Sequence, residues 1–174
     1  MKRKVFLILL VLVVITVYKV SEENVIIPSS AIRLRVIPNS NNPEDINMKE
    51  KVKKYLENNI YTLTKDINNI DEARTIIKDN EVSITEDVKE IFNDNNYNLN
   101  YNVNYGYNYF PKKYYKGIKY NEGYYESLVI SIGEAKGDNW WCVLFPNFCL
   151  VDTKDKHEYK SYLKEIQTKY SKKK

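Results

Sequence analysis

The most restrictive feature of this chain is the segment covering residues 133–152, which reads GEAKGDNWWCVLFPNFCLVD. It contains both tryptophans and both cysteines of the protein, and two of its five glycines. Tryptophan has a large apolar ring and cysteine is chemically reactive, so both residue types need defined surroundings. The cellular compartment of this segment decides what the two cysteines do.

The N-terminus indicates that compartment. Residues 2–4 are Lys-Arg-Lys, and residues 5–17 form an apolar run in which Thr16 is the only polar residue. Such a pattern is typical of an export signal, although it is short for a membrane-spanning helix of ~20 residues. No small-residue cleavage site follows, which favours an uncleaved signal anchor over a cleaved signal peptide for residues 1–21. A buried core helix is the third interpretation. In both export cases the rest of the chain lies outside the membrane.

Export would place Cys142 and Cys149 in an oxidising environment, where a disulfide is the favoured state. The bond would close a small ring and stabilise the fold by ~2–3 kcal/mol in the chain-entropy model. Two buried, reduced thiols are the alternative, because free cysteine packs as a small hydrophobe. A zinc site is disfavoured, since the cysteines lack close ligand spacing and His157 is the single histidine. We expect no metal and no other cofactor.

Composition limits the exported part to one domain. After a linker at residues 22–30, residues 31–174 suffice for a single extracytoplasmic domain with one hydrophobic core. The formal net charge is +4, but charges of both signs are interspersed along most of the chain. Only residues 172–174 form a basic run, which we interpret as a solvated tail or, alternatively, as a tether to anionic lipid. We expect no nucleic-acid partner.

Hydrophobic periodicity predicts a strand and three helices in the first half of the chain. Residues 32–36 alternate apolar and basic side chains, as in a half-buried strand. Asn42 and Pro43 then supply the N-cap and first position of a long helix. A second helix is expected near residues 69–79, and a third from the capping-box pattern that begins at Ser83. We interpret their apolar stripes as surfaces that face the core.

The period changes from helical to alternating in the second half. From residue 97 to 109 every odd position is Tyr, Leu or Val and every even one is Asn except Gly106, which predicts a strand or hairpin. Its tyrosine face most simply covers the helices. A surface that stacks on bases or sugars, or a low-complexity tract, are alternatives. Residues 124–132 predict a central strand, residues 133–139 a turn, and residues 140–145 its antiparallel partner.

A last amphipathic helix is expected over residues 157–170. The elements together predict an α+β fold: an N-terminal membrane anchor or signal helix, then one small, mostly antiparallel sheet packed on about three helices, and a C-terminal helix. The sequence contains no G-x-S-x-G, H-E-x-x-H or C-x-x-C motif. Asp152, Asp155 and His157 lie close in sequence, but a solvated loop explains them better than a metal site. We therefore expect no enzymatic activity.

These segments resemble the stage II sporulation protein R family. Residues 133–152 are similar to its hallmark, a glycine-containing turn followed by Asn-Trp-Trp-Cys-Val-Leu-Phe-Pro and a second cysteine. The stretch IRLRVIPNS at residues 32–40, with Pro-Glu-Asp shortly after it, is similar to the first strand-helix unit of the family. The chain departs from the pattern at Asn147 and Phe148, where the family more often has Pro-Leu, and in its short tail.

The resemblance implies a signalling protein rather than an enzyme. Members of the family are exported from the forespore toward the space between the forespore and mother-cell membranes. There they trigger a membrane-embedded aspartic protease, which removes the pro-sequence of sigma-E. For this chain we expect the same localisation, attachment to the membrane through the N-terminal segment, and that protease as partner. The alternative is an exported cell-envelope module that binds glycan or peptidoglycan through its tyrosine face.

The expected partner-binding residues lie at the two ends of the predicted strand at residues 140–145, which contains both tryptophans. Aromatic side chains make good interface anchors, so the candidates are Asn139, Trp140, Trp141, Phe145, Pro146 and Phe148. Because side chains alternate along a strand, Trp140 and Trp141 should point to opposite faces of the sheet. At most one of them should then be buried against the helices, and core packing is the alternative role for both.

Overall fold

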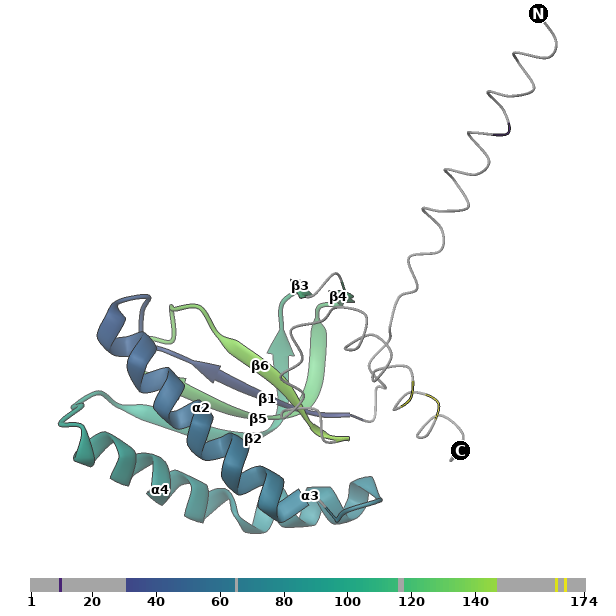
Figure 1. The fold of residues 1–174 in the computed structure, drawn as a ribbon, viewed down its shortest axis with the longest axis horizontal. Coiled ribbons are helices and arrows are strands. Elements are labelled where there is room, and N and C mark those ends of the chain that lie inside the picture. The colour runs from purple at the N-terminus through teal and green to yellow at the C-terminus, as the bar shows by residue number, and fades with distance from the viewer. Residues whose placement is uncertain are drawn as a thin grey trace, which may run out of the picture.

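The structure is a computed structural model, and it describes residues 31–64, 66–115 and 118–146 together with a few isolated positions. Three helices and a four-stranded sheet make up most of this region (Figure 1). The elements in chain order are β1 (Ile32–Ile37), α2 (Pro43–Thr64), α3 (Ile70–Asp79), α4 (Glu81–Asp94), β2 (Tyr101–Phe110), β3 (Lys113–Tyr115), β4 (Ile118–Tyr120), β5 (Gly123–Ile132) and β6 (Trp140–Phe145).

Several predictions fall on residues outside those ranges. The signal or anchor at residues 1–21, the linker at residues 22–30 and the last helix at residues 157–170 lie outside the described part, so they stay predictions. The extent of the domain beyond residue 146 stays a prediction for the same reason. Within the described ranges, no helix combines the length and the apolar character needed to cross a bilayer.

The sheet is mixed, with the strand order β2-β5-β1-β6. β1 is parallel to β5 and antiparallel to β6, and β2 is antiparallel to β5. The prediction of an α+β fold with a mostly antiparallel sheet is thus confirmed apart from the parallel β1–β5 pair. The predicted pairing of residues 140–145 with the preceding strand is wrong, because β1 lies between the two. Cys142 is paired with Leu34 of β1 instead.

The helices begin close to the predicted positions. The N–H of Ile46 donates to the carbonyl of Asn42 at 3.0 Å, as expected at the start of α2. The side chain of Asn69 caps α3 by accepting hydrogen bonds from two N–H groups of its first turn. The predicted start of the third helix at Ser83 is wrong, because α4 already begins at Glu81.

The early start of α4 follows from the tight link between two helices. Asn80 ends α3, where its N–H donates to the carbonyl of Ile76 at 3.1 Å, and its own carbonyl accepts from the N–H of Ile84 at 2.8 Å. One residue therefore serves both helix ends. Ser83 lies inside the first turn of α4, and the residue in the N-cap position is Asn80, which makes no side-chain cap.

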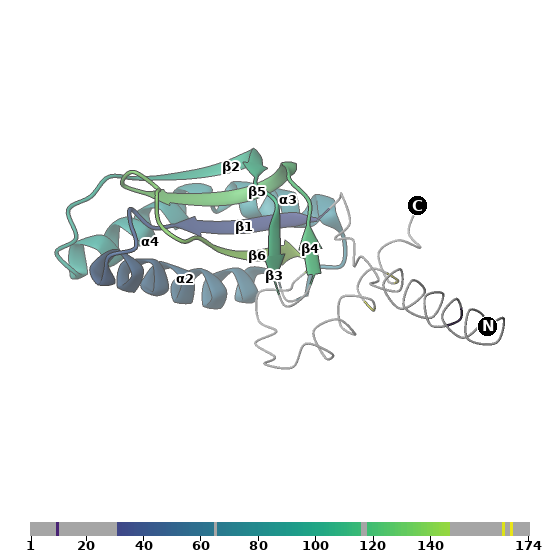
Figure 2. The same cartoon turned by 90° about the horizontal axis from the view of Figure 1, so that it is seen from above.

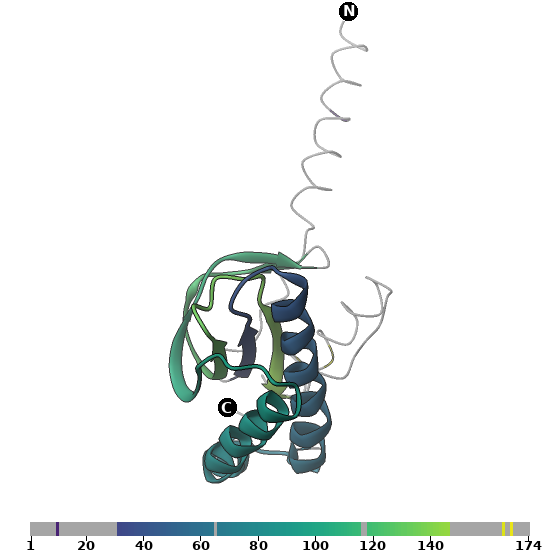
Figure 3. The same cartoon turned by 90° about the vertical axis from the view of Figure 1, so that its left-hand side faces the viewer.

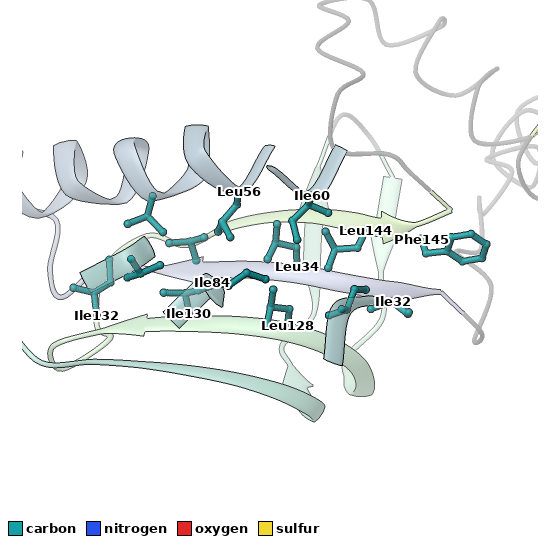
Figure 4. Packing of buried hydrophobic residues seen from close by; sticks show 14 of the residues in the cluster. Ile32, Leu34, Leu56, Ile60, Ile84, Leu128, Ile130, Ile132, Leu144 and Phe145 are labelled. Atoms are coloured by element: carbon teal, nitrogen blue, oxygen red, sulfur yellow. The ribbon is translucent and has the colours of Figure 1, made fainter. Parts of the chain in front are cut away.

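All three helices cover the same face of the sheet (Figures 2 and 3). The apolar half of the β1 alternation points into this layer, where it meets β5, β6 and the apolar stripes of the helices. The predicted core-facing stripes are confirmed, because their central residues are almost fully buried. Figure 4 shows part of this cluster, including Ile32, Leu34, Leu56, Ile60, Ile84, Leu128, Ile130, Ile132, Leu144 and Phe145.

The predicted strand at residues 97–109 is real but begins later, at Tyr101, and residues 97–100 are irregular. In the first half of β2 the alternation works as predicted, since Tyr105 packs against the helix layer. Beyond the helices the same face is open to solvent. There Tyr107 is 72% exposed and Tyr109 is 48% exposed.

Candidate functional site

Two loops at one end of the sheet bind each other closely. Residues 38–42 follow β1, and residues 133–139 connect β5 to β6, as the predicted turn requires. Backbone N–H groups of the second loop donate to the first: Lys136 to the Asn39 carbonyl at 3.0 Å, Gly137 to the Pro38 carbonyl at 3.1 Å, Glu134 to Asn39 Oδ1 at 2.9 Å, and Asp138 to Asn41 Oδ1 at 2.6 Å. We call these two segments the loop pair.

The glycines of the second loop are required by this close approach. Gly133 has a φ of +55°, a conformation that side chains disfavour. A Cβ on Gly137 would lie 2.3 Å from the backbone oxygen of Ser40. The loop pair thus explains why both glycines stand where they do, and it fixes the point at which β6 enters the sheet.

Asp45 anchors the first loop from the start of α2. Its buried carboxylate accepts hydrogen bonds from Asn39 Nδ2 at 2.9 Å, Ser40 Oγ at 2.6 Å and the hydroxyl of Tyr97. These bonds lower the pKa of the Asp45 carboxyl, and the bond from Ser40 has the largest effect. Burial and the bond to Asp45 raise the pKa of the Tyr97 hydroxyl. The cluster has the character of a structural anchor.

The face of the sheet opposite the helices carries a second, different cluster. The β3–β4 hairpin continues from the ends of β2 and β5 and crosses over this face (Figure 2). Beneath and beside the hairpin lie basic and aromatic side chains from five strands. We call them the arginine face, which consists of Arg33, Arg35, Phe110, Lys113, Tyr125 and Trp141.

The basic half of the β1 alternation is therefore covered rather than solvated. Arg33 is only 5% exposed, whereas a half-buried strand would present it to water. Its guanidinium carbon lies 3.3 Å from the ring centroid of Tyr125, and that of Arg35 lies 5.5 Å from Phe110 and 5.7 Å from Trp141. Cations stacked on aromatic faces are attracted by the ring quadrupole. Burial lowers the pKa of both arginines, which nonetheless stay charged in proteins.

The hydrogen-bond donors of the arginine face are only partly used. Arg35 Nη1 donates to the carbonyl of Tyr109 at 3.2 Å. The Nε atoms of Arg33 and Arg35 and Nε1 of Trp141 are buried without a hydrogen-bond partner. Among the residues that the structure describes, no ion pair joins either arginine to a carboxylate. Buried donors are normally satisfied, so this face has unused capacity for an acceptor.

Lys113 adds a third cation at the edge of the arginine face. Its Nζ lies 4.7 Å from the ring centroid of Trp141 and donates to the carbonyl of Asn139 at 3.4 Å. Burial, and then the neighbouring charge of Arg35, lower the pKa of Lys113, while Asp138 acts in the opposite direction. Positive charge therefore accumulates around Trp141.

The structure divides the predicted partner-binding residues between two faces. Trp140 packs toward the helix layer, where Lys53 Nζ lies 5.5 Å from its ring centroid. Trp141 points to the opposite side, onto the arginine face. The predicted alternation of the two tryptophans is thus confirmed. Both rings remain partly exposed.

The other candidates contribute little to a common surface. Asn139 is half-buried beside Trp141, while Phe145 and Pro146 are buried. Phe148 lies outside the described residues. Their role in binding stays a prediction. The sequence analysis did not identify Arg33 and Arg35 as candidate site residues. The available signal was their alternation with apolar residues in the predicted strand at residues 32–36.

Two chemical predictions depend on residues beyond the described part. Cys142 is half-buried on β6, but Cys149 lies outside, so the disulfide stays a prediction. Asp152, Asp155 and His157 also lie outside. Within the described residues, no group of three or more His, Cys, Asp and Glu side chains is arranged to hold a metal ion.

The geometry defines an α+β protein with helices on one side of a mixed sheet and a cationic, aromatic site on the other. The chain belongs to the stage II sporulation protein R family, whose model matches residues 28–155. It is similar to the stage II sporulation protein R of Bacillus subtilis (strain 168), with 36% identity over 137 residues. This match covers 79% of the chain but only 61% of the relative. No solved structure matches the chain.

Proposed function

We propose that this chain is an exported sporulation signal that activates a membrane-embedded aspartic protease and so causes processing of pro-sigma-E in the mother cell. Membership of the stage II sporulation protein R family carries the proposal, because the match spans both the loop pair and the arginine face. In this role the chain acts by binding and not as an enzyme.

The proposed localisation is the space between the forespore and mother-cell membranes, with the chain either anchored or secreted. It is supported by the basic residues 2–4 followed by the apolar residues 5–17. Fractionation of a tagged chain, with and without residues 2–17, tests this step. Recovery of the intact chain in the cytoplasmic fraction would contradict it.

Activation requires that the chain binds the active form of the protease more tightly than the inactive form. A shift from 1% to 99% active needs a ratio of affinities of about 10⁴. Arginine, tyrosine and tryptophan are the side chains that most often dominate such interfaces. The arginine face combines all three around Trp141, which makes it the preferred contact surface for the protease.

The test is reconstitution in a non-sporulating host that carries the cognate protease and a tagged pro-sigma-E. We expect the substrate to shorten only when the chain is present and exported. A chain without residues 2–17 is the control for export, and a protease without its catalytic aspartate is the control for cleavage. No shortening with a competent protease and a folded, exported chain would refute the signalling role.

An exported envelope-binding module is the second candidate, and exposed tyrosines favour it. Tyr107 and Tyr124 are each 72% exposed, and Tyr109 is 48% exposed. The rings of Tyr109 and Tyr124 lie 5.6 Å apart between centroids. Aromatic rings of this kind can stack on sugars. Binding to purified sacculi that is lost in Tyr107→Ala or Tyr124→Ala would support this function, whereas a pure signal should not need the wall.

A further inference from the structure

We propose that the arginine face is a docking site for an acidic peptide segment of a partner protein, whose carboxylates pair with Arg33 and Arg35. The inference rests on the proposed function only where it assigns this peptide to the protease. The binding site itself follows from the burial, charge and unused donors of the described residues.

Arg33 is the most deeply buried cation of the arginine face. Its side chain is 5% exposed, and its Nε has no hydrogen-bond partner. The stack on Tyr125 at 3.3 Å fixes the plane of the guanidinium, and Tyr125 also takes part in its hydrogen bonding, which leaves the buried Nε as the donor without a partner. A buried charge without a counter-charge is costly. A carboxylate matches the forked donor geometry and would remove that cost.

Arg74 provides a comparison, because it is an arginine whose charge is paired within the chain. Arg74 on the helix side donates from Nε to both carboxylate oxygens of Glu126, at 2.9 and 3.1 Å, and from Nη1 to Asp71 at 2.7 Å. These bonds raise the pKa of Arg74, whereas burial lowers the pKa values of Arg33 and Arg35. An internal carboxylate is thus supplied on one side of the sheet. Among the described residues, none forms an ion pair with Arg33 or Arg35 on the other side.

Neighbouring groups make the site selective for negative charge. Arg35 is half-buried, and its Nε and Trp141 Nε1 are further buried donors without partners. Lys113 lies near enough to Arg35 for the two charges to oppose each other. Asp138 partly compensates Lys113, but no carboxylate is among the groups that shift the pKa values of the arginines. A ligand with two or more carboxylates would relieve this repulsion.

The depth of the site favours a peptide over a membrane surface. Lipid headgroups are bound by clusters of exposed lysines and arginines that face the bilayer. Arg33 instead lies beneath the hairpin and between aromatic rings, with Phe110 fully buried at its side. The half-buried Arg35 is the point at which a side-chain carboxylate can reach this face, and its aromatic surroundings are typical of protein interfaces.

The test uses the full-length chain in nonionic detergent and a fluorescein-labelled peptide of alternating Glu and Leu, capped at both ends. The matched control peptide has Gln in place of Glu. Fluorescence anisotropy should show binding of the Glu peptide only. Arg35→Gln should weaken that binding at least tenfold, since a hydrogen bond to a charged group of this kind is lost. Lys89→Gln, which removes the same charge from an exposed position on α4, should leave it unchanged.

Arg33→Gln should weaken binding to a similar extent, with circular dichroism used to check that the variant folds. Arg35 decides the test if the Arg33 variant is unfolded, because Arg35 is less buried. Equal binding of the Glu and Gln peptides, or equal affinity of the Arg35 and Lys89 variants, would overturn the proposal. Binding of phosphatidylglycerol vesicles that depends on Arg35, without peptide binding, would assign the site to lipid and also overturn it.

The host experiment separates this inference from the signalling role. Loss of both peptide binding and substrate processing in Arg35→Gln supports the assignment of the peptide to the protease. Loss of peptide binding with full processing would refute that assignment. Failure of the unmodified chain to cause processing, with peptide binding intact, would refute the signalling role and leave the docking site standing.

Discussion

The contact between the two loops leads to a steric prediction for Gly137→Ala. A Cβ at this position would lie 2.3 Å from the oxygen and 2.6 Å from the carbon of the Ser40 carbonyl. Both are backbone atoms, so no side-chain rotation relieves the overlap. Accommodating the methyl group requires residues 38–42 and residues 133–139 to move apart.

The expected cost has two parts. Forcing an extra methyl group into a packed site costs ~1–3 kcal/mol. The separation also stretches the hydrogen bond from the Gly137 N–H to Pro38, at 3.1 Å, and a lost hydrogen bond adds about 1 kcal/mol. We expect the free energy of unfolding to fall by about 2–4 kcal/mol in total. For a chain of this size the melting temperature should fall by roughly 4–16 °C.

Gly106→Ala is the matched control, because a Cβ there meets no atom within 4 Å. Alanine in place of glycine inside a strand should stabilise the protein by about 0.5–1 kcal/mol. Urea unfolding followed by circular dichroism measures both variants in parallel. If Gly137→Ala proved as stable as Gly106→Ala, the close packing of the loop pair would be disproved.

Three further predictions concern charge and redox chemistry. Asp45→Asn keeps the shape of its hydrogen-bonded cluster but loses the charge, so it should cost about 1–2 kcal/mol at neutral pH. The pKa of Asp45 is lowered in the folded state, so the difference in unfolding free energy between the two proteins should be full above the unfolded pKa of ~3.9 and vanish as the pH falls through the folded pKa. Urea titrations across that pH range measure this difference. A difference that does not depend on pH would contradict the prediction. Glu126→Gln should cost about 2 kcal/mol because Arg74 loses its forked partner, and the double variant with Arg74→Gln should cost less than the sum. Mass spectrometry of the exported, non-reduced chain should find Cys142 linked to Cys149, with ~2–3 kcal/mol of stability lost on reduction; free thiols would refute the disulfide.

Local sequence patterns predicted the parts of the fold that local physics decides. The start of α2 directly after Asn42 and the apolar stripes of the helices follow from local sequence signals, and both are confirmed. The start of α4 was misplaced because a capping-box pattern at Ser83 competes with Asn80, which the preceding helix places directly before α4. Residues 97–100 keep the alternation of β2 but are not part of the sheet, because the partner strand β5 ends at Ile132, opposite Tyr101. Tyr97 instead donates a hydrogen bond to the buried Asp45.

Long-range pairing was beyond such patterns. Nothing in residues 140–145 reveals that they pair with β1 rather than with β5, because an apolar strand fits either neighbour. The arginine face could not be predicted for the same reason. Its members come from five separate strands, and only the topology brings Arg33 and Arg35 under Phe110 and beside Trp141. The candidate Trp141 was found from its residue type, but its partners were not.

The position of β1 has a consequence for the order in which the protein is assembled. β1 is the first strand of the described domain, and both of its neighbours in the sheet, β5 and β6, are the last to follow along the chain. Pairings between segments so distant in sequence form slowly. During export of the proposed kind, β1 would reach the far side of the membrane long before either neighbour. β1 would remain unpaired until then, and the sheet would be completed only after β6 had crossed the membrane. A chain exported in this way would cross the membrane before its sheet could form, so the arginine face would be assembled only on the far side.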